Sequence, residues 1–212
     1  MTDWTTEALR LFRRYETEIV QRYGLCPWAD PARRSGAMRE RVLLQTDGTV
    51  RASLDALRAL DEDAGVEVAV LIYPRIGLGL EGFERFVGAV RDADAKAHPL
   101  GRIPFAMAVF HPDARADTSG PERLIPFLRR TPDPTIQVVR SSVLERVRSG
   151  APQGTSFVSL ASLDFSATPQ PPLRERIARS NLARVTAEGL AEVTRRLDAI
   201  RDDRAATYRG LT

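Results

Sequence analysis

Two short, almost uninterrupted apolar runs constrain the fold of this chain more than any other feature. Val66–Tyr73 and Phe105–Phe110 are rich in β-branched and aromatic residues, and each is followed by a proline within two positions. Runs this short and this apolar are typical of strands that a sheet buries on both faces. Because such strands need covering helices, the two runs predict a layered fold that contains a sheet.

Amphipathic patterns predict helices around these strands. Apolar residues recur at steps of three and four along several segments, which is the period of a helix with one buried face. We therefore expect an α/β domain, with α+β as the alternative, in which four to five strands form a small mixed sheet. The predicted helices are Trp4–Tyr23, Val50–Leu60, Leu80–Val90 and a short one opened by the capping pattern at Ser142, and the further strands are Val42–Leu44 and Thr135–Val139.

The domain organisation follows from length and from one biased segment. A chain of 212 residues fits a single domain, 1–212. Residues 149–172 hold much of the proline and predict a stiff connector. Residues 173–204 then predict a long C-terminal helix whose apolar stripe packs on its own domain or on a second copy of the chain, so a homodimer is one possible partner arrangement.

Composition argues against two classes of partner. The formal net charge of +3 comes from arginines that are spread along the chain and interleaved with acids, as in Arg91-Asp92-Ala93-Asp94. Nucleic-acid binders concentrate their charge into a stripe, so we expect no nucleic-acid partner. There is no apolar run of the roughly 18 residues that a membrane span needs, and no secretory leader pattern. These observations predict a cytoplasmic protein without a membrane partner.

Cys26 and His111 are the first candidates for chemistry. Cys26 is the only cysteine, which excludes an intramolecular disulfide and a multi-cysteine zinc site. Pro27 restrains it at the stiff exit from the first helix, as a buried thiol or as a reactive one. His111 ends a strand, where ligands often bind in α/β sheets. It is a candidate general base, metal ligand or haem ligand, and the alternative is a hydrogen-bonded structural histidine.

Three arginines flank the turn before the last predicted strand. Arg129, Arg130 and Arg140 carry guanidinium groups, which suit the capture of a carboxylate or a phosphate. Structural ion pairs with Asp113 or other acids would produce the same pattern. We nevertheless include Asp113 and Trp28, which lie beside His111 and Cys26 in the sequence, in the predicted substrate-binding set.

The segments that carry these residues resemble a known family. The blocks are Gly24-Leu25-Cys26-Pro27-Trp28-Ala29, Val70-Leu71-Ile72-Tyr73-Pro74, Phe110-His111-Pro112 and Arg130-Thr131-Pro132-Asp133-Pro134. Together they resemble the signature blocks of the bacterial family catalogued as domain of unknown function 1415, over roughly Ala8 to Val185. The resemblance implies no established activity. Gln137 stands where the family pattern has histidine, so a two-histidine metal site of that family would lack one ligand in this chain.

Three functions remain open from the sequence. The first is an enzyme for a small anionic molecule, with His111 and Cys26 as catalytic groups and Arg130 and Arg140 as an anion clamp. The second is a redox protein that holds haem or a transition metal through His111. The third is a binding or dimerisation module that performs no chemistry.

Overall fold

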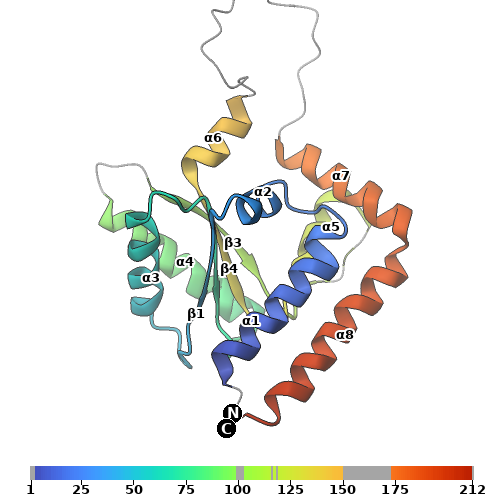
Figure 1. The fold of residues 1–212 in the computed structure, drawn as a ribbon, viewed down its shortest axis with the longest axis horizontal. Coiled ribbons are helices and arrows are strands. Elements are labelled where there is room, and N and C mark those ends of the chain that lie inside the picture. Colours follow the sequence, from blue (N-terminus) through green and yellow to red (C-terminus); the bar gives the residue numbers. More distant parts are fainter. Residues whose placement is uncertain (1–2, 99–102, 116, 118, 150–172, 212) are drawn as a thin grey trace, which may run out of the picture.

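A small mixed sheet lies at the centre of the computed structural model, with helices on both faces (Figure 1). The structure describes residues 3–98, 103–115, 117, 119–149 and 173–211. Among these residues, one sheet contains four strands in the order β1-β2-β4-β3. The strands are β1 (Met38–Val42), β2 (Val68–Ile72), β3 (Phe105–Phe110) and β4 (Thr135–Arg140).

The helices surround this sheet along the whole chain. α1 and η1 form one continuous rod, in which η1 is a π-helix. The described helices are α1 (Trp4–Tyr15), η1 (Glu16–Gln21), α2 (Ala29–Arg34), α3 (Arg51–Glu62), α4 (Leu80–Ala97), α5 (Pro121–Leu128), α6 (Ser141–Ser149), α7 (Leu173–Glu188) and α8 (Leu190–Tyr208).

Strand direction decides which loops meet at each edge of the sheet. β1 is parallel to β2, whereas β4 is antiparallel to both β2 and β3. Ile72 and Phe110 both pair with Thr135, so β2 and β3 end where β4 begins. We call this end of the strands the Thr135 edge, as distinct from the edge strands β1 and β3. Arg140 pairs with Phe105 at the opposite edge, which we call the Arg140 edge.

The two faces of the sheet carry separate cores, because side chains alternate along a strand. Leu71, Ile136 and Val138 pack with α3 and α4. Val70 and Ile72, which flank Leu71 in β2, pack with α1, η1, α5, α7 and α8. We call these the α4 face and the α1 face.

The structure confirms the mixed helix-and-strand class, the small mixed sheet and the long terminal helices, and it corrects several boundaries. β1 is Met38–Val42 and not Val42–Leu44, because a half-exposed edge strand does not need an apolar run. β3 is also an edge strand and stays partly exposed, so the prediction that both faces of Phe105–Phe110 are buried was wrong. Helix α2 was not predicted, since six residues are too few to show a periodic pattern.

The C-terminal segment differs from one long helix. Gly189 has a φ of +91°, which separates α7 from α8. Val193, Leu197 and Ile200 of α8 are buried in the core with α1 and η1, so the apolar stripe of α8 packs on its own domain. A homodimer through this helix stays a prediction. Of the predicted connector, 149–172, all residues after 149 lie outside the described part of the chain.

We find no helix within the described residues that combines the length and the apolar character needed to cross a membrane.

Candidate functional site

Cys26 lies in a short segment between η1 and α2 that is fixed from two sides. Gly24 has a φ of +55°, which turns the chain out of the helix. Arg184 of α7 donates a hydrogen bond to the carbonyl oxygen of Gly24. Asn181 of the same helix donates to the carbonyl oxygen of Leu25, at 3.3 Å. The backbone before Cys26 is therefore held between η1 and α7.

Replacing Gly24 by alanine should lower the free energy of unfolding by more than its backbone strain alone, which is about 1–2 kcal/mol. A Cβ at this position would come too close to the flexible end of the Arg184 side chain, which would have to move and lose its hydrogen bonds to the carbonyl oxygens of Tyr23 and Gly24. Gly36→Ala is the matched control, because Gly36 has a φ of +73° but open space around it. Urea unfolding of both variants provides the comparison. Equal losses would show that the contact with α7 contributes nothing.

Hydrogen-bond donors surround the sulfur of Cys26. Nε2 of Gln137 in β4 lies 3.8 Å from Sγ, and the backbone amides of Trp28 and Ala29, at the start of α2, act to lower the pKa of the thiol. Burial raises the pKa of the Cys26 thiol, while these donors and the positive charge of Arg129 act in the opposite direction. Burial outweighs these opposing effects, so the thiol is protonated at neutral pH.

Arg129 lies on the same face of the sheet. Its guanidinium group stacks on the ring of Phe110, with 5.1 Å between its central carbon and the ring centroid. Phe110 alternates with Val109, which packs on the α4 face, so the Phe110 ring belongs to the α1 face. The hydroxyl of Tyr15 donates to the carbonyl oxygen of Leu128 at 2.6 Å and thereby fixes the chain just before Arg129.

The edge strand β3 runs beside this group of side chains. Gln137 pairs with Ala108, which is only partly buried, and Ala106 is exposed. Because both of these residues are alanines, β3 presents only small side chains on the α1 face next to Cys26. The Cys26 thiol and the Gln137 amide are thus in contact beside a strand with small side chains, and Arg129 stacks on Phe110 on the same face of the sheet. We call Cys26, Gln137 and Arg129 the thiol site.

His111 lies on the other face and has hydrogen bonds at both ring nitrogens. Nε2 is 3.1 Å from the carbonyl oxygen of Leu78, and Nδ1 accepts from the amide of Asp113 at 3.1 Å. The ring also packs against Phe83 of α4. Since Cys26 contacts the opposite face through Gln137, the sheet separates the imidazole from the thiol. The catalytic role of His111 stays a prediction, and its hydrogen bonds favour a structural role.

Arg140 is separated from the other two arginines by the length of β4. Its guanidinium group pairs with Asp61 at 2.9 Å and donates to the carbonyl oxygens of Leu60, Asp63 and Val66. Thr135 and Arg140, which mark the two edges, are five residue steps apart along β4, about 16 Å at the usual rise. The structure therefore does not form the expected clamp of Arg130 and Arg140.

The remaining predicted residues are divided between the two edges. Arg130 donates to the carbonyl oxygen of Ala114 at 2.9 Å and stacks on Phe127, away from the thiol site. The side chain of Asp113 is exposed. Trp28 supplies a backbone amide to Cys26, whereas its ring packs with a separate small core that includes Val139.

Sequence reasoning missed one residue that had a detectable signal. Glu16 interrupts the apolar stripe of the first helix, four positions after Phe12 and three before Ile19, so its side chain points toward the core. The structure leaves only 3% of this residue exposed. An acid on a buried stripe is unusual enough to mark a position for scrutiny.

A comparison with protein families matches this same part of the chain. The family model described as "Protein of unknown function (DUF1415)" covers residues 8–159, more than half of the sequence. The chain belongs to the DUF1415 family. Searches of curated proteins and of solved structures found no match. The matched region of this DUF1415 member contains Cys26, Arg129 and Gln137, whereas Asn181 and Arg184, which hold the Cys26 segment, follow it.

Metal ligands are sparse in the part of the chain that the structure describes. No group of three or more histidine, cysteine, aspartate or glutamate side chains there is placed to hold an ion. Gln137, which stands where the resemblance places a histidine, directs its amide toward Cys26. The site chemistry on view is therefore that of a thiol among hydrogen-bond donors.

Proposed function

We propose that this protein is an enzyme that takes a small anionic molecule on the α1 face of the sheet, beside Cys26. The observation that supports this proposal is the contact of the Gln137 amide with the Cys26 thiol, on the same face of the sheet as the Phe110 ring on which Arg129 stacks. All of the groups named around the sulfur are donors or cations. Such surroundings suit a carboxylate or a phosphate.

Each group has a distinct role in this proposal. Arg129 pairs with the charge of the ligand, and its stacking on Phe110 limits the directions in which it can reach. Gln137 and the amides of Trp28 and Ala29 donate to a ligand oxygen or to the sulfur. Cys26 is the reactive group, and burial holds its thiol in the protonated form at neutral pH.

Replacing Arg129 by glutamine tests the binding step. Phosphate and a panel of small carboxylates are titrated against the wild type while the alkylation of Cys26 by iodoacetamide is followed. We expect one of these anions to slow alkylation, and the Arg129→Gln variant to bind it about 10- to 100-fold more weakly, the usual loss for a charge-assisted hydrogen bond.

The control for this test is Arg123→Gln, an identical change on an exposed arginine of the adjacent helix that pairs with Asp117. It should leave the protection unchanged. If no anion in the panel protects the wild type, or if Arg129→Gln is protected equally, the proposal is wrong. Cys26→Ser then separates catalysis from binding, because a binding module would keep its ligand and have no turnover to lose.

A further inference from the structure

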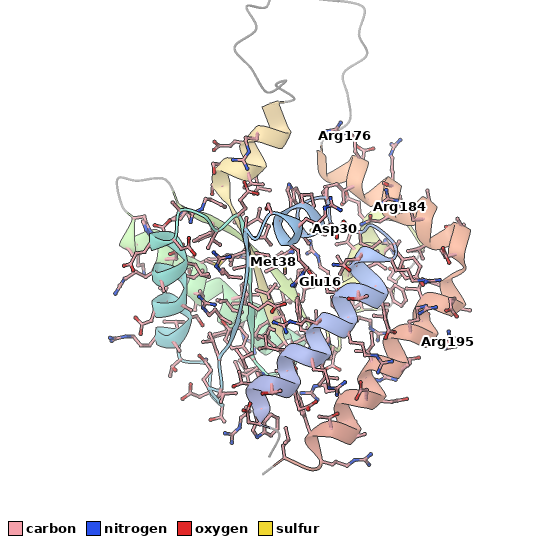
Figure 2. The ribbon with its side chains drawn as sticks, in the orientation of Figure 1. Glu16, Asp30, Met38, Arg176, Arg184 and Arg195 are labelled. Atoms are coloured by element: carbon pink, nitrogen blue, oxygen red, sulfur yellow. The ribbon has the colours of Figure 1, made fainter. Side chains whose placement is uncertain are left out.

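A buried ion network joins η1, α2 and β1 beside the Cys26 segment. Oε2 of Glu16, the first residue of η1, pairs with Nη2 of Arg33 in α2. The same nitrogen of Arg33 lies 2.7 Å from Oε1 of Glu40 in β1, and Arg13 of α1 lies 2.6 Å from the other oxygen of Glu40. Figure 2 shows Glu16 near Met38, the first residue of β1, where these elements come together.

This network leaves polar atoms unsatisfied. Within the described residues, Oε1 of Glu16 and Nε of Arg33 are buried without a hydrogen-bond partner. Each such atom costs about 1–3 kcal/mol. Burial raises the pKa of Glu16, and Arg33 only partly opposes this effect. A buried pair with these costs is poor evidence for a role in stability alone.

The position of Glu16 adds a second indication. It begins a π-helix, and short π-helical segments inside α-helices are frequent at functional sites. η1 ends at Gln21, and Gly24 then turns the chain toward Cys26. The network and the thiol site are therefore connected through both η1 and α2.

Helix α2 is anchored by this network and by the small core in which Ala32 packs with Val68 and Val139. It has only six residues, and its buried members are the small Ala29 and Ala32, so it buries little apolar area of its own. Arg33 ties it to η1 and to β1 at once. At the other end of the same helix, Trp28 and Ala29 follow Cys26 by two and three residues, and their amides act to lower the pKa of its thiol.

We propose that Glu16 is a positioning residue for the thiol site: by holding Arg33 it fixes α2, and α2 places the Trp28 and Ala29 amides at the Cys26 sulfur. This inference rests on the proposed role of Cys26, since it explains how the surroundings of that thiol are maintained. Glu16 does not touch the sulfur in this scheme and acts through Arg33.

The test is the pKa of the Cys26 thiol in the ligand-free protein, measured by thiolate absorbance and by the pH profile of alkylation. Glu16→Gln keeps the shape of the side chain and removes its charge. The loosened amides should stabilise the thiolate less, so the pKa of Cys26 rises and the thiolate fraction at pH 8 falls about three- to tenfold, the value of one hydrogen bond. Reading the inflection of the profile separates this effect from any change in accessibility.

The matched control is Glu18→Gln, two residues along the same π-helix. Glu18 pairs with Arg14, away from α2, so its loss should leave the pKa of Cys26 unchanged. Arg33→Gln should act in the same direction as Glu16→Gln, and the double variant should show no further shift, because both changes break one link. Arg33→Lys, which keeps the charge, is the second variant if Glu16→Gln does not fold.

An inflection that stays in place in Glu16→Gln and Arg33→Gln, whatever happens to their stability, overturns the inference. The outcome is separable from that of the binding proposal, because no anion is present. A shift in the thiol pKa without anion protection contradicts only the proposed function. Protection without a shift contradicts only the role of Glu16.

Discussion

Replacing Asp133 by alanine should lower the free energy of unfolding by about 3 kcal/mol, because it removes the shared partner of two α8 side chains. Asp133 is fully buried, and it accepts from Nε of Arg204 at 2.7 Å and from the hydroxyl of Tyr208 at 2.6 Å. We expect the lower end of the range for broken buried pairs, since the Arg204 side chain is 31% exposed and can recover some hydration.

Urea unfolding measures this loss directly, and an unchanged slope against denaturant would show that the compactness of the two states is preserved. Asp117→Ala is the control: it removes an exposed partner of Arg123 and should cost no more than about 1 kcal/mol. Tyr208→Phe removes one of the two bonds to Asp133 and should cost about 1 kcal/mol. If Asp133→Ala falls within 1 kcal/mol of the wild type, this carboxylate does not anchor α8.

Local patterns were sufficient for much of the fold. The apolar run at Val66–Tyr73 and the three- and four-residue steps of the helices are properties of short windows. They predicted β2 to within two residues at each end and the start of α4, which continues to Ala97, seven residues beyond the predicted end at Val90. β1 was displaced because its sequence, Met-Arg-Glu-Arg-Val, has the charged character of an edge strand. The pairing of β4 between β2 and β3 is a long-range property that no window of the sequence contains.

The site was harder to predict because it depends on faces and edges. The sequence brought together Arg129, Arg130 and Arg140 as one cluster. Strand alternation places Gln137 on the α1 face, while Ile136 and Val138 pack on the α4 face. The antiparallel register then moves Arg140 to the far edge. Of the predicted site residues, the structure brings Arg129 and Cys26 onto one face. Gln137 lies on the same face, although the sequence singled it out only because it stands where the family pattern has histidine.

The blocks that resemble the family therefore combine two kinds of requirement. The Asp133 turn holds α8 against the sheet, and the Cys26 segment forms the thiol site. A sequence block cannot distinguish a residue retained for packing from one retained for chemistry, because both need a defined neighbourhood. His111 is the residue for which this distinction matters most.

Replacing His111 by alanine should lower the free energy of unfolding by about 2–3 kcal/mol and leave the thiol site unchanged. The change removes the link to the Leu78 carbonyl, the bond from the Asp113 amide and the packing on Phe83. His98→Ala is the control, a histidine that is partly exposed at the end of α4. It should cost no more than about 1 kcal/mol, the usual limit for a partly exposed hydrogen-bonding group.

The same variant measures whether His111 affects the thiol site on the opposite face of the sheet. The pKa of Cys26 and its protection by anions should match the wild type at temperatures where His111→Ala is folded, because the ring lies on the α4 face and the thiol on the α1 face. A variant that keeps its stability but loses protection would return His111 to the reaction. It would also require the thiol and the imidazole to approach each other in a conformation that opens the edge near Phe110.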